Sequence, residues 1–126
     1  RLKMEEFNKS CYFKVRINGS LKSGKYSIDE VAKFDKLRAK KICKNDLNSK
    51  FMDIAFQVKS FEAKIVSDDG NYIFKIKGNS LSKLRGAMAS LRSGDFIIFS
   101  NIKTNVFLNK KKVNEVHSED MVIEIK

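Results

Sequence analysis

The stretch FMDIAFQVKSF, residues 51–61, is the strongest indicator of the fold in this sequence. Apolar side chains recur at every second position from Met52 to Val58, with polar side chains such as Gln57 and Lys59 between them. This period of two is typical of a strand with one buried face. Aromatic and β-branched residues are also common in it. We therefore expect residues 51–61 to form a central strand of a sheet.

Similar alternating runs lie on both sides of this stretch. They predict further strands at residues 12–18, 36–44, 62–67, 71–77, 95–104 and 121–125, and a hairpin within 106–113 that turns at 109–112. Asp68-Asp69-Gly70 predicts the tight turn between two of them, because an Asp-Gly pair tolerates the positive φ angles of short hairpins. The chain is therefore expected to contain about seven strands.

Two short helices are expected among the strands. Ser27 followed by Glu30 matches a capping box, which predicts a helix over about 28–35. Apolar residues at helical spacing predict a second helix over about 81–91; they are Leu81, Leu84, Met88 and Leu91. The predicted fold class is mainly β (α+β), with antiparallel sheets in a sandwich-like arrangement.

Length and composition favour one domain spanning residues 1–126. The chain of 126 residues has no proline and no Gly/Ser-rich linker, so no internal boundary is indicated. Residues 1–11 are interpreted as a disordered or linker lead-in. Because the sequence begins with Arg1 and not with Met, we expect it to be part of a longer protein. The longest apolar run, 96–99, is far too short to span a membrane.

The charge is strongly basic. Lys and Arg total 26 against 15 Asp and Glu, and the net charge of +11 favours an anionic partner, which could be an acidic protein, a membrane surface or nucleic acid. A basic β domain that binds single-stranded nucleic acid is the alternative function. Against it, four phenylalanines fall on the apolar side of their strands, where they cannot stack on bases: Phe13, Phe56, Phe74 and Phe99.

Two groups of basic residues are candidates for binding a protein partner. One lies on a single face of the predicted strand 36–44 and the other at the predicted hairpin tip; the residues are Lys36, Arg38, Lys40 and Lys44, and Lys110, Lys111 and Lys112. Such residues could increase the association rate with an acidic partner and fix the register in which the two proteins bind. Equally, lysines on an edge strand could serve only to prevent pairing with other chains.

Catalytic, metal-binding and cofactor-binding residues are not indicated. His117 is the only histidine, and it lies in a polar segment without a nucleophile pattern or metal-ligand spacing. We expect no enzymatic activity, no small-molecule substrate and no cofactor. Cys11 and Cys43 could pair in an oxidising compartment, but their spacing does not decide whether they do.

Several ordered motifs resemble the C-terminal region of the GldM/PorM family. They are LKSGKYSIDE at 21–30, LRA at 37–39, the strand 51–61, GNS at 78–80, LRSGD at 91–95, FSNIK at 99–103 and IEIK at 123–126. The family usually continues after the N-I-K run with a P-D-G turn, whereas this chain has NKKK at 109–112. The resemblance therefore fits both the principal motor protein of this family and a divergent paralogue of that protein.

The resemblance implies a role in type IX secretion and gliding motility of Bacteroidetes-type bacteria. It implies a periplasmic, dimeric rod anchored by an N-terminal helix in the inner membrane, with this chain as the distal, C-terminal domain of that longer protein. That domain would contact ring subunits associated with the outer membrane, as a non-enzymatic protein–protein interaction module.

Overall fold

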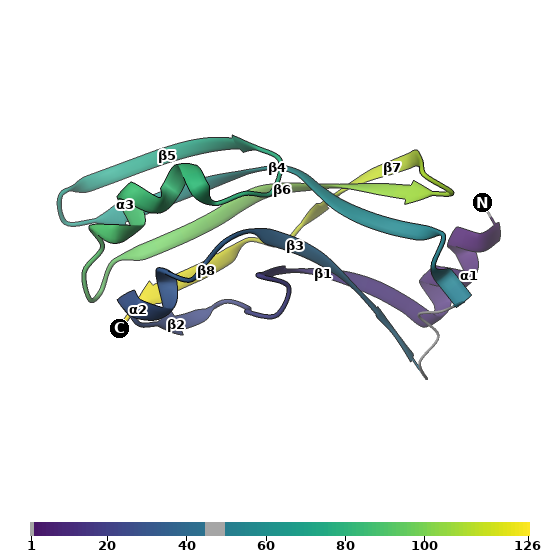
Figure 1. Ribbon diagram of the computed structural model, residues 1–126, viewed down its shortest axis with the longest axis horizontal. Coiled ribbons are helices and arrows are strands. Elements are labelled where there is room, and N and C mark those ends of the chain that lie inside the picture. Colours follow the sequence, from purple (N-terminus) through teal and green to yellow (C-terminus); the bar gives the residue numbers. More distant parts are fainter. Residues whose placement is uncertain (1, 45–49) are drawn as a thin grey trace.

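In residues 2–44 and 50–126, which the computed structural model describes, the chain folds into two facing sheets (Figure 1). The strands are β1 (Cys11–Ile17), β2 (Gly24–Tyr26), β3 (Leu37–Cys43), β4 (Ile54–Ser67), β5 (Gly70–Lys77), β6 (Phe96–Leu108), β7 (Lys111–Ser118) and β8 (Met121–Ile125). The helices are α1 (Leu2–Ser10), α2 (Ile28–Val31) and α3 (Arg85–Ala89), and a 3-10 turn at Ser82–Leu84 leads into α3. The mainly β, sandwich-like prediction is confirmed.

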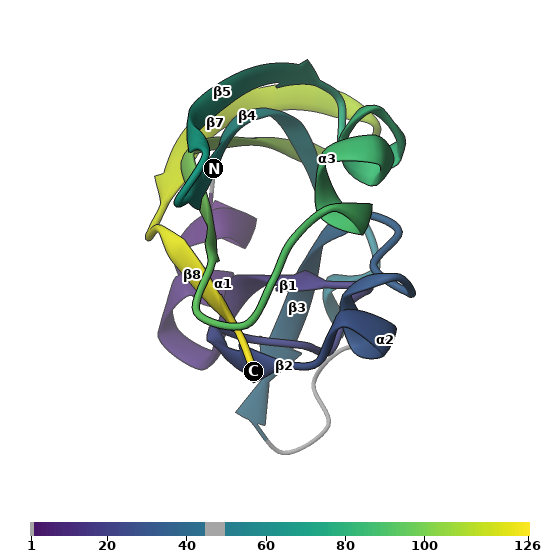
Figure 2. The ribbon, with the colours of Figure 1, turned by 90° about the vertical axis from the view of Figure 1, so that its left-hand side faces the viewer.

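The described strands divide into a small sheet and a large one. The small sheet pairs β1 with β3, and the large sheet has the order β2-β8-β6-β4-β5, with β7 also on β6. β8 and β7 pair in succession along one edge of β6, and β4 pairs along the other edge. The large sheet curls, so that β8 and β2 lie in the same layer as β1 and β3 (Figures 1 and 2).

The main hydrophobic core fills the space between the two sheets. Ile17 and Leu37 contribute from the small sheet, and both are fully buried. Phe61 and Phe99 contribute from the large sheet and meet edge to face, with ring centroids 5.9 Å apart. A second buried cluster lies beside α1 and the start of β4; its members are Phe7, Cys11, Phe51 and Ile54.

The predicted strand at 51–61 and its neighbour at 62–67 form one strand, β4. It pairs with β5 on one edge and β6 on the other, which agrees with the central position expected for it. Met52 is 79% exposed, although the alternation placed it with the core. It lies in the turn that precedes Ile54, where the strand alternation does not yet apply. Two register shifts against β6, between Val58 and Glu62, mark an irregularity that bends the strand.

The first predicted helix begins where expected and ends early. The Ser27 hydroxyl accepts a hydrogen bond from the Glu30 amide, and a Glu30 carboxylate oxygen accepts one from the Ser27 amide, which completes the capping box. α2 nevertheless ends at Val31, not near Asp35. The Asn18 side chain accepts a hydrogen bond from the Asp35 amide, which directs the chain into β3 instead of a further helical turn.

Other elements also differ from the sequence prediction. β2 lies in a stretch for which the sequence predicts no strand, and it pairs parallel to β8, so the large sheet is mixed and not purely antiparallel. Only Arg85–Ala89 of the predicted helix 81–91 is α-helical, after the 3-10 turn. Residues 2–10 form α1, which the sequence does not anticipate, and Phe7 from this helix is buried.

Candidate functional site

The small sheet carries an exposed cationic surface. In the antiparallel register of β1 and β3, Lys14 lies opposite Lys40 and Arg16 lies opposite Arg38. We call these four residues the basic face. Val15, Ile17 and Leu37 turn the other way, into the main core, and Cys11 turns into the second buried cluster. The alternation of each strand thus separates a buried apolar side from a basic side.

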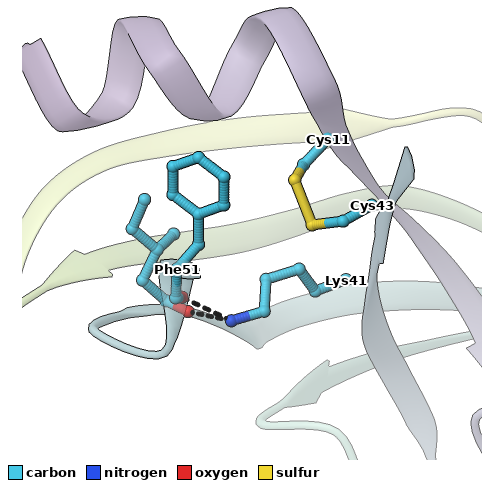
Figure 3. The surroundings of a disulfide bond; sticks show 5 residues. Cys11, Lys41, Cys43 and Phe51 are labelled. Carbon is cyan, nitrogen blue, oxygen red and sulfur yellow. Dashed lines mark hydrogen bonds between the residues drawn. A yellow bond between two sulfur atoms is a disulfide. The ribbon is translucent and has the colours of Figure 1, made fainter. Parts of the chain in front are cut away.

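A disulfide bond closes one end of this sheet. Cys11 and Cys43 are register partners, and their sulfur atoms are bonded (Figure 3). The bond joins positions 32 residues apart in the sequence. It therefore restrains β1 and β3 as a pair, in a sheet that has two strands within the described part of the chain and would be marginal alone.

Lys41 supports the same end from the inner side of β3. Its ammonium nitrogen donates hydrogen bonds to the carbonyl oxygens of Phe51, at 2.6 Å, and Ile54, at 2.9 Å (Figure 3). Burial lowers the pKa of the Lys41 side chain, while the nearby Asp53 carboxylate opposes that shift. Lys41 thereby links the small sheet to the start of β4.

The four cations of the basic face have no acidic partner in an ion pair among the described residues. Directly opposed like charges on a sheet are unfavourable. Glu119 and Asp120 line the same pocket as Lys14 and Arg16, but they form no ion pair with them within residues 2–44 and 50–126. The positive charge of this face is therefore available to another molecule.

The structure separates the candidate residues that the sequence singled out. Arg38 and Lys40 lie on the basic face, whereas Lys36 immediately precedes β3 and Lys44 follows it; all four are exposed. Lys14 and Arg16 join them only through strand pairing. The sequence places Lys14 and Arg16 on the polar side of their strand, but a pattern within one strand cannot show which strand lies beside it.

The other group of candidates lies at the tip of the β6–β7 hairpin. Asn109 and Lys110 have positive φ angles of 51° and 67° and form its turn. The turn is shorter than the predicted 109–112, because Lys111 and Lys112 already belong to β7. Lys110, Lys111 and Lys112 are all exposed. Lys112 differs from the other two because its ammonium nitrogen lies 3.2 Å from a Glu115 carboxylate oxygen.

Glu115 is the centre of a small ionic network on the large sheet. Hydrogen bonds from Lys59, at 2.8 Å, and Lys112 lower the pKa of Glu115 to about 2. The carboxylate therefore stays ionised well into the acid range, and it offsets part of the charge at the hairpin.

His117 is exposed on β7, opposite Lys103. Across the residues that the structure describes, no group of three or more acidic, histidine or cysteine side chains is arranged to hold a metal ion. Likewise, none of the helices found in those residues is long and apolar enough to cross a membrane.

The fold and this surface define a mainly β, two-sheet domain with a cationic face on its small sheet. Residues 13–126 match the model of the GldM C-terminal domain. The chain belongs to the GldM C-terminal domain family, a domain related to type IX secretion and gliding, and the resemblance noted in the sequence is confirmed. None of the curated proteins with which the chain was compared matches it.

Proposed function

We propose that this domain is a non-enzymatic interaction module of a type IX secretion or gliding machine, and that its basic face binds an acidic surface of a ring subunit associated with the outer membrane. The observation that carries the proposal is the ladder of opposed cations, Lys14 with Lys40 and Arg16 with Arg38. Charge complementarity of this kind increases the association rate with the partner and fixes the register of the complex. In this role the domain is the distal part of a periplasmic rod anchored in the inner membrane, and the rod is a dimer.

The disulfide supports the periplasmic placement. Cys11 and Cys43 are both paired, and they are the two cysteines of the chain. Disulfides persist in oxidising compartments such as the periplasm and are rare in the cytosol. A bond that restrains the sheet bearing the basic face also fits a module that transmits force through that face.

The hairpin lysines are the second candidate surface. Lys110 and Lys111 are exposed at the β6–β7 tip, but Lys112 already contacts Glu115. The hairpin therefore offers less unpaired charge than the basic face, and we propose it as the weaker contributor to partner binding.

Co-purification with the ring subunits of the same bacterium tests the proposal. A variant with Lys36→Glu, Arg38→Glu and Lys40→Glu should lose capture of a ring subunit. A matched variant with Lys110, Lys111 and Lys112 changed to Glu alters the net charge equally and should retain most of the capture. Wild-type capture should weaken with added salt. Equal capture by wild type and the first variant would exclude the basic face from the interface.

Binding of single-stranded nucleic acid remains the competing function because of the net charge of +11. Phe13 and Phe56 are not free to stack on bases, because their rings stack on each other with centroids 4.4 Å apart. A gel-shift titration with a single-stranded oligonucleotide tests this function: nucleic-acid binding would give a shift that falls steeply with salt, whereas the proposed protein interaction predicts no shift.

A further inference from the structure

One edge of β4 is occupied by a strand along only part of its length. β5 pairs with β4 from Ser60 to Ser67, whereas residues 54–58 of β4 pair only with β6, on the opposite edge. The amide of Gly78 donates a last hydrogen bond to the Lys59 carbonyl oxygen, and Gly78 then turns the chain away with a φ of +86°. In residues 2–44 and 50–126, no strand continues the position of β5 beside residues 54–58.

Within the described part of the chain, main-chain groups of β4 at residues 54–58 therefore have no strand partner on the side that faces β3. The Asp53 carbonyl oxygen accepts a hydrogen bond from Asn109 on the β6 side, and the Ile54 carbonyl oxygen accepts one from Lys41 on the β3 side. Because successive residues of a strand direct these groups to opposite edges, Phe56 and Val58 share the orientation of Ile54. Their amides point away from β6.

The strand across from this edge is also unpaired on its facing side. β3 pairs with β1 only, within the described residues. The Leu37 amide donates to the Asn79 carbonyl oxygen, on the side away from β1. By the same alternation, the main-chain groups of Ala39 and Lys41 face β4. Unpaired strand edges of this kind are templates for another strand.

A groove of about 700 Å³ opens between these two edges. Its β3 side carries the cations Arg38 and Lys40, and its β4 side carries the exposed apolar residues Met52 and Ala55. None of the described residues that line it is acidic. The groove therefore combines positive charge and apolar surface with main-chain groups of Phe56 that have no strand partner on this side among the described residues, while the Ile54 carbonyl oxygen accepts its hydrogen bond from Lys41.

We propose that an extended acidic segment of the protein partner binds in this groove by adding a strand to the edge of β4 at residues 54–58. Main-chain hydrogen bonds to β4 supply the pairing, as in other cases of strand addition. Side chains of the bound segment alternate between its two faces. Acidic side chains on one face contact Arg38 and Lys40, and small or apolar side chains on the other face pack against the domain. This inference rests on the proposed function, and it specifies how the partner is held.

Residue-resolved amide hydrogen exchange tests the inference directly. The probe is a synthetic peptide of alternating glutamate and valine, added to the full chain. Exchange should slow by about tenfold or more at the amides of Ile54, Phe56 and Val58. The amides of Ala55 and Gln57 already bond to β6, so their exchange should change little. This alternation distinguishes strand addition from general contact with a charged surface.

Two matched controls sharpen the test. A peptide of alternating glutamate and proline has the same charge but cannot form a strand, and it should produce no alternating protection. At the exposed position 55 of the protein, Ala55→Glu should weaken binding of the glutamate–valine peptide by about tenfold, and Ala55→Lys, of similar bulk, should preserve it.

The outcomes separate this inference from the function on which it rests. If capture of the ring subunit depends on the basic face but the complex shows no alternating protection of amides, strand addition is wrong and the proposed function stands. If capture does not depend on the basic face and no alternating protection is seen, both the inference and the proposed function are wrong. If a single-stranded oligothymidylate binds while the glutamate–valine peptide does not, the groove serves a nucleic acid and the inference is wrong.

Discussion

Arg16 lies directly opposite Arg38 in the antiparallel ladder of β1 and β3, and the adjacent pair on the same side is Lys14 with Lys40. Like charges in this position repel each other and lower the stability of the sheet. A protein that keeps such an arrangement on an exposed surface gains from it if the compensating charge belongs to another molecule. Stability and partner binding should therefore respond in opposite directions to changes on this face.

Replacement of Arg38 by glutamate should separate the two effects. Arg38→Glu creates an opposite-charge pair with Arg16, and it should raise the free energy of unfolding by roughly 0.2–1 kcal/mol at low salt. The same variant should capture the ring subunit less well. Urea unfolding at low and high salt provides the measurement, since screening should reduce the gain.

Lys75→Glu on β5 is a matched control, because Lys75 lies opposite Glu62 in the β4–β5 register. This change creates a like-charge pair and should lower stability by a similar amount. If both variants shift stability in the same direction, the cross-strand repulsion does not operate as described.

The disulfide should supply a large share of the stability of the small sheet. Replacing both Cys11 and Cys43 by serine removes a cross-link between positions 32 residues apart. The free energy of unfolding should fall by roughly 3–4 kcal/mol. Urea unfolding of the variant and of the oxidised wild type measures this difference; identical midpoints would show that the bond contributes nothing to stability.

Lys41 should stabilise the start of β4 through its two hydrogen bonds. Lys41→Met keeps the length and apolar stem of the side chain but leaves the carbonyl oxygens of Phe51 and Ile54 without this donor. We expect a loss of about 1–2 kcal/mol in unfolding experiments. The adjacent, exposed Lys40 is the control, and Lys40→Met should cost no stability. A stabilising effect of Lys41→Met would contradict the assigned role.

Glu115 predicts a specific pH dependence. Its folded-state pKa is about 2, below the ordinary value of 4.5, so the unfolded chain binds this proton more readily. The stability that Glu115 contributes is therefore complete well above pH 4.5 and is lost as the pH falls towards about 2. Relative to wild type, Glu115→Gln should be less stable near neutral pH and equally stable near pH 2. A gap that widens with acidification would contradict the ionic network.

Alternation within single strands allowed much of the fold to be predicted. It identified the strands that became β1, β3 and the core-facing part of β4, and the capping box located the start of α2. Elements without a pattern were not predictable: β2 has only three residues and is defined by its pairing with β8. Met52 was assigned to the wrong side because the alternation continues into a turn, where the strand geometry is absent.

Only half of the basic face was predictable, because alternation relates residues within one strand and not residues on neighbouring strands. Arg38 and Lys40 share a face of one strand, so their alternation alone brings them together. Lys14 and Arg16 reach the same surface through a register between distant segments, which a single sequence does not encode locally. The pairing of Cys11 with Cys43 depends on the same register, and the spacing of the cysteines could not decide it.

Site-specific photo-crosslinking in the living cell tests the central claim most directly. Tyr12 and Tyr72 are similarly exposed, at 51% and 54%, but Tyr12 lies on β1 beside the basic face and Tyr72 lies on β5. With benzoylphenylalanine at each position in turn, we predict a crosslink from position 12 to an acidic ring subunit of the cell envelope, and none from position 72. A crosslink to that subunit from position 72 alone would contradict the assignment of the basic face as the binding surface.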